Sequence, residues 1–340
     1  MNIPVFITHA GCRNECVFCN QRIITGRSAS VSVVAAREAI DYYIGRVGRG
    51  IDTEIAFFGG SFTGLEKSVM VGLLGLAREY IAEYEFIKGV RLSTRPDYIS
   101  REVLGLLAEY QVGNIELGVQ SMFDDVLRAS RRGCSVADCE NACKLVSLAG
   151  IGLTGQIMLG LPESSREKDI ATAERLADLG VQSARVYPAV VLENTELYAM
   201  HKRGEYAPLS LGEAVWRAKE IKKIFDARGI KILRMGLCSS DNISLGSCAG
   251  PYHPAFGELV ESELFYERLC ADLEKISSRD VLIETARKNM SKVVGHKRGN
   301  IIRLQGKFAK NIKIVENDDI NGEYNIIVGA APREIAFGEV

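Results

Sequence analysis

The sequence has no hydrophobic run long enough to cross a membrane, and it has only four histidines and one tryptophan in 340 residues. Its longest apolar stretches, such as residues 69–77, fall well short of the roughly 20 residues that a transmembrane helix needs. The first residues also lack the basic and then apolar pattern of a secretory signal. We therefore expect a cytoplasmic protein without a membrane-spanning helix.

The sequence also has no large excess of either charge, since 42 Lys and Arg residues nearly balance 43 Asp and Glu residues. Residues 286–313 depart from this balance, because nine basic residues occur there without one acid. Such a run is often only a solvated face, but it also suits a polyanionic ligand. We expect the contacts to come from Lys292, Lys297, Arg298 and Arg303.

Short apolar runs alternate with patterns of helical length and period over the first half of the chain. The expected strands are residues 3–8, 54–58, 89–93, 114–119, 153–159 and 183–187. The expected helices between them are residues 33–47, 65–84, 100–110, 136–149 and 165–179. This alternation predicts a parallel sheet with right-handed crossovers. Six strands are too few to close an eight-stranded barrel, so we expect either an open barrel or a doubly wound sheet.

The alternation stops after Pro188. A helix is expected over residues 211–227, then a loop rich in Gly, Ser and Pro over 236–257, and a further helix near 258–276. The end of the chain predicts a hairpin of residues 311–315 and 324–328, turning at Asn321 and Gly322. We therefore expect a first domain over residues 1–235 and a small α+β domain over residues 236–340.

Three of the nine cysteines, Cys12, Cys16 and Cys19, lie within eight residues, directly after the first expected strand. Without a secretory signal, clustered thiols favour metal binding over a disulfide framework. Three thiolates leave one position of a 4Fe–4S cluster open, whereas structural zinc requires a fourth ligand that this loop does not supply. The spacing favours an iron–sulfur cluster, with zinc and fortuitously buried thiols as the alternatives.

This Cys-x3-Cys-x2-Cys loop, with Phe18 before the last cysteine, resembles the signature of the radical S-adenosylmethionine (SAM) superfamily. The resemblance implies a partial (β/α)6 TIM-like barrel in which Cys12, Cys16 and Cys19 hold a 4Fe–4S cluster. It also implies that the open iron binds SAM, and that an electron from the cluster cleaves SAM to methionine and a 5′-deoxyadenosyl radical. An iron–sulfur cofactor suits this role because no side chain supplies an electron at so low a potential.

Later segments resemble the same superfamily in the same order. Residues 57–62 are similar to its Gly-Gly-Glu segment, and residues 156–162 to the strand that approaches the adenine. Arg132 is our choice for the SAM carboxylate, because a guanidinium fork fits that group. Ser93 and Gln156 stand where related enzymes carry acids, and both can still form hydrogen bonds. The SAM contacts that the resemblance implies are Phe18, Gly59, Gly60, Ser61, Ser93, Gln120, Arg132 and Gln156.

Residues 93–97, 118–121 and 131–133 are similar to the Elongator catalytic subunit and to oxygen-independent coproporphyrinogen III oxidases, and residues 185–206 are nearer to Elongator. The resemblance implies modification of a tRNA base, with a flavodoxin or ferredoxin as electron donor. No Elongator-type acetyltransferase domain is expected in the residues that follow the barrel. Radical decarboxylation of a porphyrinogen and a non-catalytic protein that binds zinc or RNA are the alternatives.

The other cysteines have less distinctive settings. Cys134, Cys139 and Cys143 could form a second metal site, although their helical spacing favours small buried core residues. Cys238 and Cys248 flank a loop that contains His253, where a zinc site or a redox pair is the alternative to isolated thiols.

Overall fold

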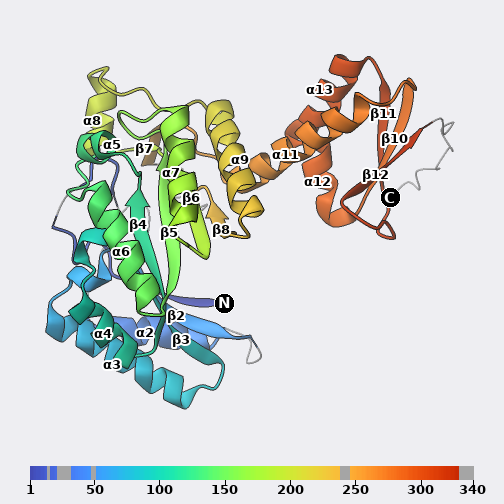
Figure 1. Cartoon of the computed structure of the whole chain (residues 1–340). Coiled ribbons are helices and arrows are strands. Elements are labelled where there is room, and N and C mark those ends of the chain that lie inside the picture. The colour runs from blue at the N-terminus through green and yellow to red at the C-terminus, as the bar shows by residue number, and fades with distance from the viewer. Residues whose placement is uncertain (14–15, 21–31, 47–50, 238–245, 329–340) are drawn as a thin grey trace. The chain divides into compact units, whose positions relative to one another are not determined.

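A computed structural model describes residues 1–13, 16–20, 32–46, 51–237 and 246–328 (Figure 1). The chain divides into two compact units, Met1–Pro254 and Ala255–Val340. The predicted domain boundary, after residue 235, lies before the end of the first unit and stays a prediction. Among the described residues, no helix combines the length and the apolar character that crossing a bilayer requires.

The first unit is built on one seven-stranded sheet with the strand order β1-β2-β3-β4-β5-β6-β8, in which every neighbouring pair is parallel. Its strands are β1 (Asn2–Phe6), β2 (Thr53–Phe58), β3 (Ile87–Thr94), β4 (Val112–Gln120), β5 (Gly152–Leu159), β6 (Ser183–Pro188) and β8 (Lys231–Met235). The sheet curls into a half-barrel, which confirms the predicted partial TIM-like fold. All six expected strands are present, and β8 adds a seventh.

Helices connect these strands; six of them were predicted from the sequence, whereas the short helices α5 and α8 were not. They are α2 (Val33–Ile44), α3 (Lys67–Glu83), α4 (Arg101–Glu109), α5 (Asp124–Ala129), α6 (Val136–Leu148), α7 (Arg166–Asp178), α8 (Glu196–Lys202) and α9 (Leu211–Ala227). Several begin at a Ser or Thr whose side chain accepts a backbone N–H of the first turn, as Ser100 and Ser165 do. A short antiparallel pair, β7 (Val191–Leu192) with β9 (Ser247–Ala249), forms a separate two-stranded sheet. Because consecutive strands are parallel, their carboxyl ends and the loops that follow lie at one edge of the sheet.

The second unit has its own core between α11 (Phe256–Leu273) and a three-stranded sheet. Its other elements are β10 (Asp280–Thr285), α12 (Met290–Val294), α13 (Gly299–Phe308), β11 (Asn311–Glu316) and β12 (Tyr324–Val328). The predicted hairpin is wrong, because β11 and β12 do not pair with each other. Both pair with β10, β11 in parallel and β12 antiparallel. The physical reason is that β10 buries Val281 and Ile283 in the core of the unit and takes the centre of the sheet.

Candidate active site

The loop after β1 carries the three clustered cysteines and lies against the loop after β2. The Ser61 N–H donates to the Ala10 carbonyl at 2.9 Å, and the His9 N–H donates to the Gly59 carbonyl at 2.9 Å. A Cβ on Gly60 would lie 2.5 Å from the Ala10 oxygen, so only glycine permits this approach. The contact places the Cys12 sulfur 3.2 Å from the Ser61 hydroxyl.

The second cysteine of the loop contacts a different part of the fold. Arg132, in the turn between α5 and α6, donates through Nη1 to the Cys16 sulfur at 3.4 Å. The Val17 N–H donates to the Ser130 carbonyl at 3.1 Å, and the Cys19 N–H donates to the Cys16 carbonyl at 3.0 Å. Cys16 is therefore held against the barrel, while Cys12 is exposed.

The described residues do not gather three Cys, His, Asp or Glu side chains into a set that could hold a metal ion. The structure thus brings Cys12 to Ser61 and Cys16 to Arg132 without drawing the three sulfurs of the loop together. The donor chemistry nevertheless fits an iron–sulfur cluster, because three thiols lie on one short loop. A guanidinium that donates to one of them would also stabilise a thiolate ligand.

Several residues expected to contact SAM meet at the carboxyl ends of β4 and β5. The Gln156 side chain donates to the Gln120 side chain at 3.3 Å. Gln120 has a φ of 69°, a conformation that few residues other than glycine adopt and that often marks a functional site. A Cβ on Gly118 would lie 2.8 Å from both the Arg132 and the Gln120 side chains. The absence of a side chain at Gly118 therefore leaves room for both.

Arg132 is more constrained than the sequence suggests. Besides Cys16, its guanidinium donates to the Gly118 carbonyl, and the residue is only 6% exposed. The neighbouring Arg95 is 1% exposed; it makes a two-bond contact with Asp97 and donates to the Arg132 carbonyl. Arg132 therefore positions the cysteine loop, and one nitrogen, Nε, lacks a hydrogen-bond partner within the described residues.

Ser93 lies apart from this group, in a charged layer inside the half-barrel. Its hydroxyl donates to Glu116 at 3.2 Å, and Glu116 forms an ion pair with Arg185 at 2.9 Å. Burial raises the pKa of Glu116, and Arg185 and Ser93 act against that rise. Buried ion pairs seldom add stability, so a pair inside a barrel is a candidate for ligand contact. Sequence reasoning missed this pair, although Glu116 alternates with Gly118 and Gln120 and so shares their face.

The aromatic residue of the cysteine loop, Phe18, packs on apolar residues beyond the ends of the strands. It contacts the cluster of Val126, Leu161 and Ala189. Phe18 therefore holds this end of the cysteine loop by apolar packing.

The basic segment of the second unit is only partly available to a ligand. Arg303 makes a two-bond ion pair with Glu263 and stacks on Tyr266, and Lys307 pairs with Glu274. The Asn300 side chain is buried and donates to the carbonyl of Ser262. Of the four predicted contacts, Arg303 is thus engaged within the unit.

Lys297 and Arg298 differ from Arg303, because both are exposed at the turn before α13. Their φ values of 51° and 62° place two successive basic residues in the left-handed conformation. The described residues offer no carboxylate within ion-pair distance of either one, or of Lys292. Three of the predicted contacts therefore lack a competing partner in that part of the chain.

The remaining cysteines do not form the second metal site that the sequence left open. Cys139 and Cys143 are completely buried, as expected for core residues, and within the described residues they do not belong to a set of side chains that could hold a metal ion. Cys248 is exposed, and Cys238 lies outside the described residues.

With this geometry established, comparisons with known proteins give a consistent family. The sequence pattern of the radical SAM superfamily matches residues 6–176, half of the chain, and that of the radical SAM C-terminal domain matches residues 181–266. A tRNA uridine(34) acetyltransferase of Methanocaldococcus infernus is 35% identical over 127 residues, covering 36% of this chain and 24% of that protein. Elongator complex protein 3 of Saccharomyces cerevisiae is 30% identical over 130 residues, covering 37% and 23%.

Among solved structures, the archaeal Methanocaldococcus infernus Elp3 with an N-terminal deletion superposes with a TM-score of 0.64 at 24% identity. The match covers 79% of this chain and 63% of that one, and it shows a shared fold. In sequence, the matched part spans about a quarter of each of the two curated relatives.

Proposed function

The chain belongs to the radical SAM superfamily, and from that premise we propose that Cys12, Cys16 and Cys19 hold a 4Fe–4S cluster for the reductive cleavage of SAM. The enzyme would use the resulting radical to modify a tRNA base. A cluster held by these three cysteines would supply the electron for cleaving the sulfonium of SAM, the reaction that gives the 5′-deoxyadenosyl radical. The remaining steps depend on how this chain's own residues bind and orient SAM and the substrate.

The observation that carries the proposal is the contact of the cysteine loop with two strand ends. Cys12 lies against Ser61 at the end of β2, and Cys16 lies against Arg132 beyond the end of β4. Residues from separate strands thus surround one loop at the edge where α/β barrels place their sites. The N–H that Arg132 donates to the Cys16 sulfur would also compensate part of the negative charge of a cluster ligand.

For SAM itself, we propose contacts from the residues that border this loop. Gly59 and Gly60 allow a ligand to approach the backbone, and Gln120 and Gln156 present amide donors and acceptors beside it. Phe18 would exclude water, while Ser61, Ser93 and the Arg132 Nε offer further polar contacts. Arg132 has two other acceptors already, so its role in holding the SAM carboxylate is secondary to its role on Cys16.

A tRNA substrate is supported by two independent facts. One relative bears the name tRNA uridine(34) acetyltransferase. In addition, Lys292, Lys297 and Arg298 offer positive charges without a competing acid nearby in the described part of the chain, which suits a phosphate backbone. We also propose that the enzyme works in the cytoplasm, where tRNA is modified, and receives electrons from a flavodoxin- or ferredoxin-like protein.

Anaerobic purification tests the proposal. We expect a brown protein with about four irons per chain, which forms 5′-deoxyadenosine from SAM when dithionite is added. Replacing Cys12, Cys16 or Cys19 with Ala should abolish both the iron and the cleavage, whereas Cys248→Ser, outside the loop, should preserve them. A colourless protein with one zinc would overturn the proposal. The tRNA assignment is then tested by profiling modified nucleosides in a deletion strain, where an unchanged profile would contradict it.

A further inference from the structure

The start of α6 places two cysteines at neighbouring positions. Ser135 caps this helix and forms a capping box with Asp138. Cys134 directly precedes the capping residue, and Cys139 is the fourth residue of the helix. At the start of many helices the side chains at these two positions pack against each other, an arrangement called a hydrophobic staple. The two thiols are close enough to affect each other's pKa. A staple normally consists of two apolar side chains, whereas here both members carry a reactive group.

The two thiols differ in their access to solvent. Cys134 is partly exposed, and Cys139 is completely buried behind it. The neighbouring Cys139 thiol, aided by the charge of Arg132, lowers the pKa of Cys134. The same contact and burial raise the pKa of Cys139. Cys134 is therefore the better nucleophile at neutral pH, and Cys139 is the protonated neighbour behind it.

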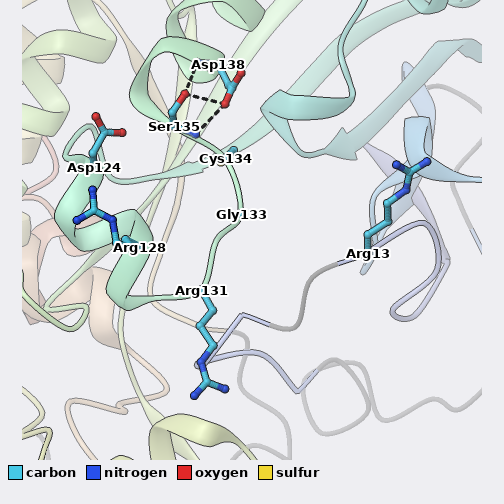
Figure 2. Close-up of a pocket in the computed structure, with 8 residues that line it drawn as sticks. All are labelled: Arg13, Asp124, Arg128, Arg131, Gly133, Cys134, Ser135 and Asp138. Carbon is cyan, nitrogen blue, oxygen red and sulfur yellow. Dashed lines mark hydrogen bonds between the residues drawn. The ribbon is translucent and has the colours of Figure 1, made fainter.

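Cys134 also borders a hollow of about 1010 Å³, which we name the arginine hollow (Figure 2). Its lining residues are Arg13, Asp124, Arg128, Arg131, Gly133, Cys134, Ser135 and Asp138. In Figure 2, Arg128 and Arg131 extend from α5 and the turn after it, and Arg13 extends from the loop after β1 on the other side of the loop that bears Cys134.

In the arginine hollow, the guanidinium groups are more available to a ligand than the carboxylates are. Asp138 accepts the backbone N–H of Ser135, and Asp124 accepts that of Val136, both at 2.8 Å. In the part of the chain that the structure describes, no carboxylate lies within ion-pair distance of Arg13 or Arg128. Within the described residues, the ion pair of Arg131 is a long one, 3.4 Å to Glu196. Guanidinium groups without close partners favour the binding of carboxylates.

From this arrangement we propose that Cys134 and Cys139 form a thiol–disulfide exchange site for a small disulfide that carries carboxylates. The arginine hollow binds the anionic reagent, and the Cys134 thiolate attacks one of its sulfurs. The disulfide bond of the reagent breaks, one half leaves as a thiolate, and Cys134 is left in a mixed disulfide.

Cys139 then completes the exchange. It gives its proton to solvent, and its sulfur attacks the Cys134 sulfur of the mixed disulfide. The second half of the reagent leaves as a thiolate and takes up a proton, and a bond between Cys134 and Cys139 forms. The protein loses two electrons and the small disulfide gains them, so no further oxidant is required. This site does not depend on the proposed SAM chemistry.

Cys248 provides an internal comparison within the same molecule. It is more exposed than Cys134, but its pKa is raised, by partial burial and by the charge of Glu193. Among the described cysteines outside the loop of Cys12, Cys16 and Cys19, exposure alone would make Cys248 react first. If the arginine hollow and the neighbouring thiol control the reaction, Cys134 reacts first.

The experiment uses the full chain, reduced and kept under nitrogen, with glutathione disulfide as the anionic probe and cystamine as its cationic counterpart. Peptide mapping by mass spectrometry identifies the products. In the unmodified protein we expect a bond between Cys134 and Cys139, formed before Cys248 reacts. The variant Cys139→Ser should instead accumulate the mixed disulfide at Cys134. The matched control is Cys143→Ser, one turn further along α6, which should behave like the unmodified protein.

A second variant tests the arginines without altering the thiols. Arg128→Gln with Arg131→Gln should slow the reaction with glutathione disulfide by about tenfold, the lower end of what local charge does to association rates. Its reaction with cystamine should not slow. Earlier modification of Cys248, absence of the mixed disulfide in Cys139→Ser, or equal slowing with both probes would overturn the proposal. The first measurement needs no variant, so it remains decisive if Cys139→Ser does not fold.

Discussion

The Arg132 guanidinium donates to the Cys16 sulfur at 3.4 Å and to the Gly118 carbonyl, so one buried side chain connects the cysteine loop to strand β4. The two residues are separated by 116 positions in the sequence. Because Arg95 in turn holds the Arg132 carbonyl, the guanidinium has little freedom to leave the sulfur. Arg132 is therefore a positioning residue for the proposed cluster.

Replacing Arg132 with Met should weaken the hold on iron. Substituting a residue that forms a hydrogen bond to a metal ligand typically lowers metal affinity by about 10- to 100-fold. We therefore expect the variant to lose iron to a chelator faster, by a factor within that range. Loss of a hydrogen bond to a cluster sulfur should also make the reduction potential more negative. The adjacent and exposed Arg131→Met is the matched control. Equal iron retention and equal potentials in the two variants would refute the role.

Gly60→Ala should destabilise the contact between the loops after β1 and β2. The added Cβ would lie 2.5 Å from the Ala10 oxygen and 2.6 Å from the Ile7 oxygen, and neither backbone atom can move alone. We expect a loss of about 1–3 kcal/mol in the free energy of unfolding, the usual cost of overpacking. Urea unfolding measures it.

The control for this substitution is Gly75→Ala, in helix α3. A Cβ there meets nothing within 4 Å. Because alanine is a better helix former than glycine, we expect a gain of about 1 kcal/mol. If Gly60→Ala were as stable as the unmodified protein, the close packing of the two loops would not be the reason for glycine at that position.

The sequence predicted the sheet well, because central parallel strands read as apolar runs between helical patterns. Strand β8 was missed, since Lys231 and Arg234 interrupt its short run and an edge strand buries fewer residues. The predicted hairpin failed for another reason. Asn321 and Gly322 indicate only a local turn, whereas the choice of β10 as partner for both strands depends on distant residues.

The candidate site shows the same division between local and distant information. The spacing of Cys12, Cys16 and Cys19 is visible within eight consecutive residues of the sequence. The contact between Gln120 and Gln156, by contrast, depends on the register of β4 against β5. The pairing of Arg303 with Glu263 likewise depends on how α13 packs on α11, so its charge alone gave too simple a prediction for that residue.

Stability at acid pH should depend on Glu213. Hydrogen bonds from Arg166 and Arg217 lower the pKa of Glu213 from 4.5 to about 2. Between these values the unfolded chain takes up a proton that the folded protein does not, so acidification favours unfolding. The contribution of Glu213 is present above pH 4.5 and is lost as the pH falls towards about 2.

Urea unfolding at successively lower pH checks this expectation. Glu213→Gln should lower the stability at neutral pH and flatten its decline in acid. Glu38→Gln, on the exposed face of α2, should leave the decline as it is, since the described residues provide no ion pair for Glu38. An unchanged acid decline in Glu213→Gln would show that the two arginines do not stabilise the fold through this carboxylate.

Binding of tRNA should depend on the turn before α13 more than on the helix itself. Lys297 and Arg298 are exposed there, while Arg303 and Lys307 on α13 already bind Glu263 and Glu274. Changing both turn residues to Gln should weaken binding and reduce the slope of affinity against salt by about two, one for each phosphate that is no longer neutralised. Changing Arg303 and Lys307 to Gln removes the same charge and is the matched control.

Fluorescence anisotropy with labelled tRNA at several salt concentrations measures both slopes, and thermal unfolding confirms that each variant is folded. A smaller slope in the control than in the turn variant would place the contact on α13 and contradict our assignment. Equal slopes would mean that only total charge matters, which would remove the structural support for a defined tRNA contact at Lys297 and Arg298.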